Sequence, residues 1–546
     1  MDVETSLQDV VKVLQGILSA DDLPTSTNNA VKSGGPGQNG DATTNITRGS
    51  TLNSQRVLPA KTASLKPAQI QEAGLETTKN SSNPVQALAD HLSNEILPYL
   101  NRQSLSPNYY GFVIGGATPA ALLGDLLAVI YDQNVHVHLP NDTIATAVEV
   151  HALNLLVQLF RLPGEEWRIG GPGSGGGIFT TGATASNILG LALGREFVLR
   201  KALEKKGVTD AASLSVGESG LSELMALAGA RKLQVLSTLP HSSVVKAAGV
   251  LGIGRKNVIP LATADNSLQI DMERLEAEVK KNDVLNILAI SSGEVNTGRF
   301  ATASLEQMTK LRQICSENGV WIHVDGAFGL FGRVLSPNDT EYTEIVNGVT
   351  GLELADSITG DCHKLLNVPY DCGMFFTKHK DLSEDVFRNG NAAYLTSGLG
   401  DGDDVQTPLN IGLENSRRFR SLPVYCTIKA YGRQGYIDML KRQIGLARRV
   451  TRWLLDDDRF EVLPHGASES EVIAKTFIIV LFRMKDENLN KGLVKRVNAT
   501  GRMFVSGTVW DGKAAARIAV SNWRVDIERD ARLIEEVLDQ ASQGDK

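Results

Sequence analysis

The sequence predicts an α/β protein that has a mostly parallel sheet and a smaller α+β unit at its C-terminal end. From residue 186 to 378, helical stretches alternate with short apolar runs, which is typical of parallel strands with helices on both faces. After a long helical run from Tyr425 to Leu455, the chain changes to closely spaced strands. Two of these strands flank Asp511-Gly512, a sequence that favours a β-hairpin.

The first part of the chain differs in composition from the rest. No aromatic residue precedes Tyr99, and residues 24–57 are dominated by Ser, Thr, Asn and Gly. Such a segment cannot bury enough apolar surface to offset its ordering entropy, so we expect a disordered linker. Residues 7–18 have apolar side chains at helical spacing, which fits either a short docking helix or a marginal helix in a loose tail.

The remaining elements follow in order from the hydrophobic pattern. Helices are expected at 88–101, 118–134, 143–160, 186–207 and 272–281, and strands at 233–238, 286–291, 320–325, 373–378, 476–484, 502–510 and 516–522. The resulting domain boundaries are a helix and linker over 1–57, a helical arm over 58–115, a large domain over 116–423 and a small domain over 424–546.

Composition excludes several classes of function. A net charge of −7 over 546 residues gives no reason to expect a nucleic-acid partner. The four cysteines lack CxxC pairs, so neither a disulfide framework nor a zinc site is expected. Acidic residues at the N-terminus and the lack of long apolar runs argue against secretion and against a membrane span. We therefore expect a cytoplasmic protein that acts on small molecules.

A glycine-rich stretch leads into the first candidate site. Residues 171–176 match GxGxxG, but no apolar strand precedes them and no helix opens within them, so a dinucleotide fold is not favoured. Residues 180–186 (TTGATAS) lead directly into a helix, where free N–H groups and the helix dipole suit a phosphate. An ordinary Ser/Thr helix cap explains the same residues.

Two further segments carry groups with chemistry. In the strand at 320–325, alternation places Trp321, His323 and Asp325 on one face, with Asp325 at the carboxyl end where open α/β sheets bind ligands. A carboxylate leaving a buried strand needs a cationic or hydrogen-bonding partner, although it could also be a simple capping residue. Lys364 lies between two small apolar segments, and an enclosed lysine favours Schiff-base chemistry.

Taken together, these motifs resemble the group II pyridoxal-phosphate-dependent amino acid decarboxylases, which have a fold-type I transferase-like large domain. The resemblance runs from about Asn108 to Arg524. It rests on four motifs that are specific in combination: 180–187 (TTGATASN), 241–246 (HSSVVK), 323–329 (HVDGAFG) and 361–364 (DCHK).

The resemblance implies a role for each matching residue. Lys364 would bind pyridoxal 5′-phosphate covalently, and Asp325 would pair with the pyridine nitrogen, which keeps the ring an electron sink. His241 would stack on the ring, unless it only caps the following helix. The other cofactor contacts implied are Ala183 and Thr184 at the phosphate, Ala327 against the second ring face, and His363 before the lysine.

The sequence also departs from the family. The animal aromatic enzymes carry a tyrosine on a mobile loop that returns a proton to the substrate carbon, but residues 397–410 contain none. Either another acid acts, with His241 the candidate, or the outcome is aldehyde-forming oxidative deamination or C–C cleavage. A non-catalytic protein of the same fold is a remoter alternative. Residues 292–297 replace the usual Gly-Thr-Thr, which leaves the partner of the cofactor phenolate open.

Substrate contacts are expected from three segments. Tyr109, Tyr110 and Phe112 could accept an aromatic amino acid, although aromatic residues also fill cores. His136 and His138 would share one face by strand alternation, as pocket or interface residues rather than as metal ligands. Arg418 lies in a segment, 417–420, that resembles the family's basic segment after the lid. The resemblance implies that one of its arginines holds a carboxylate or, because the family works as homodimers, the phosphate site of the partner subunit.

Overall fold

The computed structural model describes residues 84–171, 173–208, 214–389 and 405–543, together with 56–58 and five residues between 8 and 15. Nearly all of the expected linker at 24–57 and the first half of the expected lid at 397–410 lie outside the described residues. The division of the chain into these four parts stays a prediction.

A seven-stranded sheet in the order β1-β7-β6-β5-β4-β2-β3 forms the centre of the larger unit. Strands β2 to β6 are parallel, whereas β7 is antiparallel to both of its neighbours, so the prediction of a mostly parallel sheet is confirmed. The strands are β1 (Gly176–Thr180), β2 (Lys232–Ser237), β3 (Val258–Pro260), β4 (Val284–Ser291), β5 (Trp321–Asp325), β6 (Ser357–Asp361) and β7 (Gly373–Thr377).

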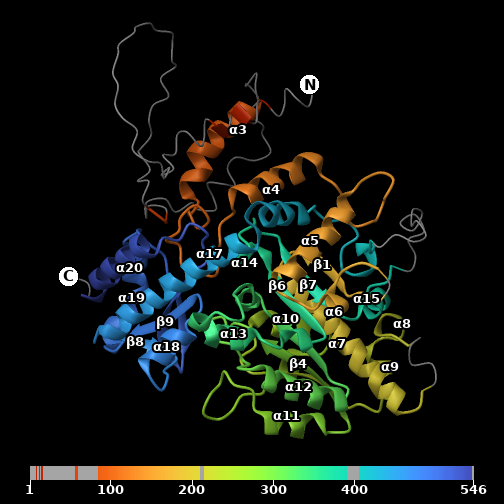
Figure 1. The fold of residues 1–546 in the computed structure, drawn as a ribbon. Coiled ribbons are helices and arrows are strands. Elements are labelled where there is room, and N and C mark those ends of the chain that lie inside the picture. The colour runs from red at the N-terminus through yellow and green to blue at the C-terminus, as the bar shows by residue number, and fades with distance from the viewer. Residues whose placement is uncertain are drawn as a thin grey trace, which may run out of the picture.

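Helices cover both faces of this sheet, as Figure 1 shows. Helix α7 (Ala183–Lys205) packs across β4 to β7 on one face, and α5 (Ala145–Leu159), α11 (Met272–Val279) and α12 (Leu305–Glu317) pack on the other. The other helices of this part are α3 (Pro84–His91), α4 (Pro119–Tyr131), α6 (Gly164–Trp167), α8 (Val216–Ser219), α9 (Leu221–Leu227), α10 (Ser242–Val250), α13 (Thr343–Val349), α14 (Cys362–Leu365) and α15 (Lys380–Val386).

The smaller C-terminal unit, blue in Figure 1, has a four-stranded antiparallel sheet in the order β10-β11-β9-β8. The expected hairpin is present, because Asp511 and Gly512 both have positive φ angles, 49° and 72°, as a type I′ turn requires. Its elements are β8 (Phe460–Leu463), β9 (Ile479–Met484), β10 (Ser506–Trp510), β11 (Lys513–Ala519), α18 (Glu469–Lys475), α19 (Glu487–Ala499) and α20 (Ile527–Ser542).

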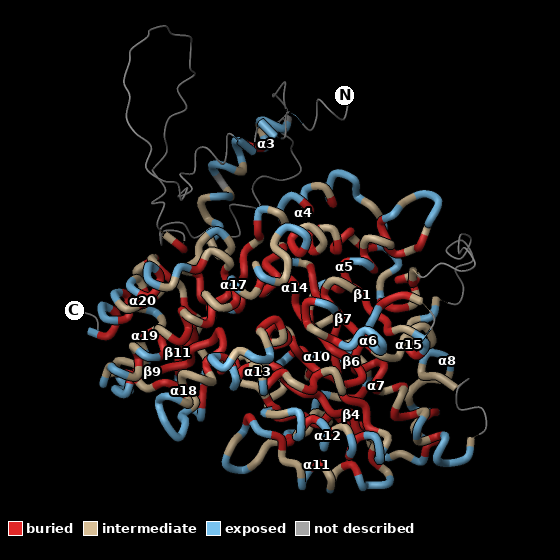
Figure 2. Tube along the Cα trace, in the orientation of Figure 1, coloured by how far each residue is buried: buried red, intermediate tan, exposed pale blue. Residues whose placement is uncertain are grey.

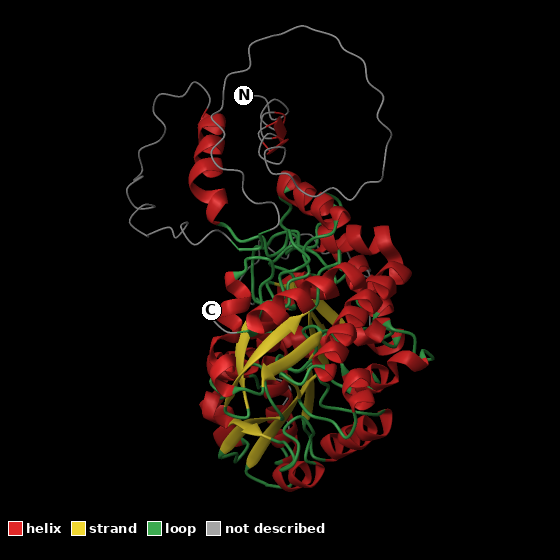
Figure 3. Cartoon of the chain, turned by 90° about the vertical axis from the view of Figure 1, so that its left-hand side faces the viewer, coloured by secondary structure: helices red, strands yellow, loops and turns green. Residues whose placement is uncertain are grey.

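Helix α17 (Ser421–Asp456) connects the two units. It packs against α4 and α5 in one half and against α20, β8 and β9 in the other, and its backbone breaks at Gly432, where φ is 58°. The two sheets and the helices that cover them are seen from the side in Figure 3.

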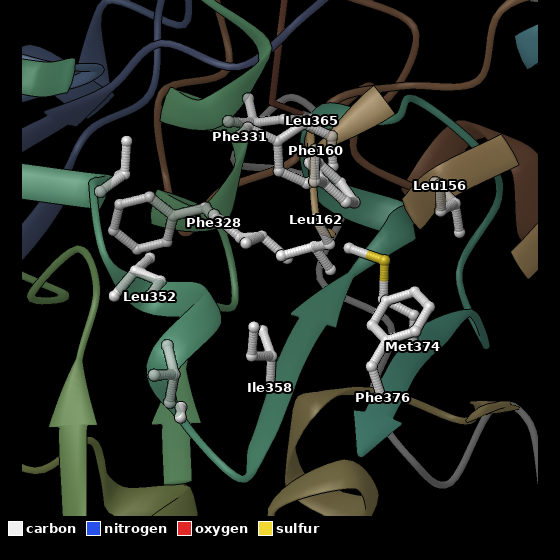
Figure 4. Close-up of a cluster of buried hydrophobic side chains, with 14 of the residues drawn as sticks. Leu156, Phe160, Leu162, Phe328, Phe331, Leu352, Ile358, Leu365, Met374 and Phe376 are labelled. Atoms are coloured by element: carbon white, nitrogen blue, oxygen red, sulfur yellow. The ribbon is translucent and has the colours of Figure 1, made fainter. Parts of the chain in front are cut away.

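The buried core follows the large sheet, as the red segments of Figure 2 show. Figure 4 shows the part of the core around β6 and β7, where Phe160 meets Phe331 edge to face at 5.1 Å between ring centroids. The same cluster includes Ile358 of β6 and Met374 and Phe376 of β7. No helix in the described ranges is long and apolar enough to cross a membrane.

Candidate active site

A cavity of about 470 Å³ lies at the carboxyl ends of the parallel strands of the large sheet. The last residues of three parallel strands line it: Ser291 of β4, Asp325 of β5 and Asp361 of β6. The structure brings all seven expected cofactor contacts to this one cavity, although their roles stay predictions. They are Ala183, Thr184, His241, Asp325, Ala327, His363 and Lys364.

Lys364 is held where β6 turns into the short helix α14. Its Nζ lies 3.0 Å from Asp361 Oδ2 and 5.6 Å from the centroid of the Phe328 ring. Gly115 packs so closely that a Cβ there would lie 2.0 Å from the Lys364 carbonyl oxygen. With its side chain 20% exposed, the lysine is partly enclosed, as predicted.

Asp325 has the buried partner that its position required. Asn187, one turn into α7, donates from Nδ2 to Asp325 Oδ2 at 2.9 Å, and the Ala327 N–H lies 3.4 Å from Oδ1. Asp325 is therefore a buried, oriented carboxylate that faces the cavity from the strand end, rather than a simple capping residue.

The start of α7 offers hydrogen-bond donors to an anion. Its N-cap is Gly182, which has no capping side chain, so the alternative of a local Ser/Thr cap is wrong. Asp361 Oδ1 instead accepts from the Ala183 N–H at 2.6 Å across the cavity floor. The N–H groups of Thr184 and Ala185 donate to no atom of the described residues.

His241 caps a helix, as one of the two sequence-based alternatives expected, and its stacking on a cofactor ring stays a prediction. It caps α10, because its Nδ1 accepts from the Ser243 N–H at 3.2 Å, and it also lines the cavity. The cavity walls desolvate its charged form and lower its pKa, an effect that nearby Asp325 opposes and Lys364 reinforces. We therefore expect a neutral imidazole at neutral pH.

His363 faces the same cavity from α14. Its Nδ1 donates to the Cys372 carbonyl at 3.0 Å, and its ring lies 4.7 Å from the ring of Tyr370. Burial lowers its pKa.

Arg517 lines the cavity and was not predicted. It is 4% exposed, and it donates from Nε to the Val295 carbonyl at 2.6 Å and from Nη1 to the Phe112 carbonyl at 2.8 Å. Its Nη2 has no partner among the described residues. Burial lowers its pKa to about 10, although Glu294 opposes the shift. The available signal was that Arg517 is the one charged residue in the expected strand at 516–522.

The segment expected to contact substrate divides into two environments. Phe112 lines the cavity and is 65% exposed, with a φ of 55°. Tyr109 instead stacks on Phe504 at 4.6 Å, and Tyr110 is buried in the core of the C-terminal unit. For these two tyrosines, the structure favours the core alternative.

The remaining expected substrate residues lie away from this cavity. Residues 135–139 form a loop, so the expected strand alternation of His136 and His138 is wrong. His138 Nδ1 lies 2.6 Å from Thr146 Oγ1, and Arg418 pairs with Asp125 at 2.7 Å. No cluster of three possible metal ligands occurs among the described residues.

The loop that replaces the usual Gly-Thr-Thr folds on itself. Glu294 is buried and accepts from the N–H and the hydroxyl of Thr297, both at 2.8 Å. Gly293 and Val295 are the residues of this loop that line the cavity. Its contribution to the cavity is therefore backbone and an apolar side chain rather than a hydroxyl.

Comparison with known proteins gives one family. The model of the pyridoxal-dependent decarboxylase conserved domain matches residues 67–484. Tryptophan decarboxylase 2 of Oryza sativa subsp. japonica is 25% identical over 476 residues, 84% of each chain. Phenylacetaldehyde synthase of Arabidopsis thaliana is 26% identical over 445 residues, 79% of this chain and 81% of the other.

Solved structures of decarboxylases share the fold of this chain. The crystal structure of Catharanthus roseus tryptophan decarboxylase in complex with L-tryptophan superposes with a TM-score of 0.74 at 20% identity, over 100% of this chain and 99% of that one. The likeness extends over both units of the chain.

Proposed function

Because the chain belongs to the pyridoxal-dependent decarboxylase family, we propose that it converts an aromatic L-amino acid to the amine and CO₂, with pyridoxal 5′-phosphate as cofactor. The observation that carries this proposal is the convergence of Lys364, Asp325 and His241 on one cavity at the carboxyl ends of the parallel strands. These are an amine, a carboxylate and an imidazole, which are the groups that pyridoxal chemistry uses.

The residues present fit this cofactor. The Lys364 amine is accessible for covalent attachment, Asp325 offers a carboxylate to a ring nitrogen, and the free N–H groups of Thr184 and Ala185 suit a phosphate. Ala327 leaves room for a flat ring because its side chain is small. When bound, the cofactor stabilises the negative charge that develops at the substrate α-carbon as CO₂ leaves.

Aromatic and cationic groups that line the cavity support an aromatic amino acid. Phe112, Phe328 and Tyr370 supply apolar surface, and the buried guanidinium of Arg517 attracts the substrate carboxylate. The relatives include enzymes named for tryptophan and tyrosine, which agrees with this choice.

His241 is the group proposed to return a proton to the substrate carbon. It lines the cavity, and its Nε2 makes no hydrogen bond to any described residue, so this nitrogen is free to face the substrate. This role would replace that of the loop tyrosine, which residues 397–410 lack.

A second outcome at the same site is decarboxylation coupled to oxidative deamination, in which O₂ is the oxidant and, with water, the products are the aldehyde, CO₂, ammonia and hydrogen peroxide. The missing tyrosine favours it, and a phenylacetaldehyde synthase is among the relatives. CO₂, amine, ammonia and peroxide measured in one reaction separate the two outcomes, because only the oxidative route releases ammonia and peroxide.

We also propose that the protein is a homodimer that associates through α4. The outward side of this helix exposes Leu122, Leu123, Leu126, Val129, Ile130 and Tyr131, each at least 49% exposed. An apolar strip of this kind marks a protein interface. Leu126→Lys should shift the sedimentation coefficient to that of a monomer, whereas Leu227→Lys, at an exposed apolar site on α9, should leave a dimer.

The decisive test measures cofactor binding and CO₂ release together. Borohydride reduction of the protein with pyridoxal phosphate should attach the cofactor to the peptide that contains Lys364, and CO₂ should form from tryptophan, tyrosine, phenylalanine or DOPA. Lys364→Ala should abolish both signals, while Lys378→Ala, a lysine paired with Glu166 outside the cavity, should abolish neither. Wild-type protein that binds no pyridoxal phosphate would overturn the proposal.

A further inference from the structure

A continuous chain of hydrogen bonds runs beneath the cavity from Trp321 to His241. Trp321 Nε1 lies 3.1 Å from Ser357 Oγ, which lies 2.8 Å from His323 Nδ1. His323 Nε2 lies 2.9 Å from Asn187 Oδ1. Asn187 Nδ2 lies 2.9 Å from both Asp325 Oδ2 and Ser243 Oγ, and the latter lies 2.7 Å from His241 Nδ1.

The protons in this chain can point in only one direction. A carboxylate only accepts hydrogen bonds, so the Asn187 NH₂ group faces Asp325 and the Asn187 oxygen faces His323 Nε2. His323 is fully buried and its pKa is lowered to about 4 by burial, so it is neutral and donates its one proton from Nε2 to Asn187 Oδ1. Its Nδ1 is then an acceptor for the Ser357 hydroxyl, which in turn accepts from the Trp321 indole N–H.

The same orientation of the Asn187 amide places its NH₂ group toward the Ser243 hydroxyl as well as toward the Asp325 carboxylate. His241 Nδ1 accepts the Ser243 backbone N–H, so this nitrogen carries no proton. It therefore also accepts the Ser243 hydroxyl proton. With Nδ1 occupied as an acceptor, the single proton of neutral His241 lies on Nε2.

Two glycines of helix α7 pack directly against the rings of His323 and Trp321. A Cβ on Gly190 would lie 2.3 Å from His323 Cε1 and Nδ1, and a Cβ on Gly194 would lie 2.9 Å from Trp321 Cδ1. The helix therefore rests directly on the two rings, which leaves the imidazole of His323 no space to turn.

We propose that Asn187 and His323 are positioning residues that orient Asp325 toward the cofactor and keep the proton of His241 on Nε2. This inference rests on the proposed function for its chemical purpose, but the proton arrangement itself exists without any substrate. Neither residue lines the cavity, so each acts through Asp325 and Ser243.

The first experiment observes the protons directly. Full-length protein labelled with ¹⁵N in its histidine rings is studied by NMR before and after pyridoxal phosphate is added, and His241→Gln and His323→Gln variants assign the signals. Before addition, both rings should carry a proton on Nε2 and none on Nδ1. A proton on Nδ1 of either neutral ring would overturn the inference, whether or not the protein decarboxylates any amino acid.

The second experiment measures affinity for pyridoxal phosphate by titration of cofactor-free protein. Asn187→Ala and His323→Leu should each weaken binding roughly 10- to 100-fold, because Asp325 loses or misplaces a charge-assisted hydrogen bond. His323→Gln should rescue most of the affinity, since its amide can donate to Asn187. Asn286→Ala is the matched control, a buried asparagine on β4 that bonds to Gln234 and lies outside the cavity.

Two outcomes of this titration count against the inference. One is wild-type affinity in Asn187→Ala, and the other is an equal loss in His323→Gln and His323→Leu. If Asn187→Ala does not fold, the NMR measurement on the wild-type protein still decides the question.

Discussion

The carboxylate of Asp361 accepts a 2.6 Å hydrogen bond from the backbone N–H of Ala183, which joins the end of strand β6, just before Lys364, to the start of helix α7. The same carboxylate holds Lys364 at 3.0 Å. One buried side chain thus links Lys364 to the start of helix α7, on two sides of the cavity.

This contact makes Asp361 a test of site assembly. Asp361→Asn keeps an acceptor for Ala183 and should retain most of the stability, whereas Asp361→Ala leaves that N–H unpaired and should cost about 1–3 kcal/mol of unfolding free energy. Urea denaturation followed by circular dichroism measures both. Equal stability of the two variants would show that the hydrogen bond does not hold the loop.

Gly373 should not tolerate a side chain. A Cβ there would lie 2.6 Å from Gly182 Cα and from Thr180 Oγ1, so Gly373→Ala has to push the 180–182 loop away from β7. We expect a loss of about 1–3 kcal/mol and weaker binding of pyridoxal phosphate. Gly164→Ala, with no atom within 4 Å of its Cβ, should behave as wild type in the same thermal-unfolding and titration measurements.

The buried ion pair of Glu149 and Arg417 should show strong coupling. Arg417 Nη1 donates to Glu149 Oε2 at 2.8 Å, and both side chains are almost completely buried. Glu149→Leu or Arg417→Met alone should cost about 3–5 kcal/mol, because each leaves a buried charge unpaired, while the double variant should cost much less than the sum. Additive losses in a double-mutant cycle would contradict this.

His136 should make the protein less stable as the pH falls. Its buried ring nitrogens have no described partner, and burial, with Arg417 nearby, lowers its pKa from 6.5 to about 4. The unfolded chain therefore binds the proton first, and stability is lost between pH 6.5 and about 4, by on the order of 3 kcal/mol in total. His136→Phe should flatten this part of the urea-midpoint profile.

The control for that profile is His465→Gln, because His465 is 68% exposed. Its curve should follow the wild type. A His136→Phe profile as steep as that of the wild type would mean that other groups cause the pH dependence.

The sequence predicted the parts of the fold that have a clear local pattern. Alternation around His323 placed Asp325 at a strand end, and Asp511-Gly512 predicted the hairpin. Strand β1 was missed because it begins with two glycines, which lower strand propensity, and it exists through pairing with β7 at the sheet edge.

The site was predicted only where its residues lie in recognisable motifs. Lys364 and Asp325 belong to such motifs, but Arg517 reaches the cavity from the far end of the chain, and only tertiary packing places it there. The structural environment of His136 could not be predicted from the sequence either, because His136 lies in a loop and strand alternation does not apply to it.

Arg517 and Phe112 enter the cavity from outside the large sheet, and the Arg517 Nη1 bond to the Phe112 carbonyl ties them together. The groups proposed for bond breaking lie at or near the carboxyl ends of the parallel strands. Arg517 instead belongs to the C-terminal unit, and Phe112 belongs to the N-terminal segment that packs on this unit. Under the proposed function, bond breaking and choice of substrate are therefore assigned to separate parts of the chain. Substitutions of Arg517 and Phe112 would then change which amino acid enters without altering the residues proposed for the reaction.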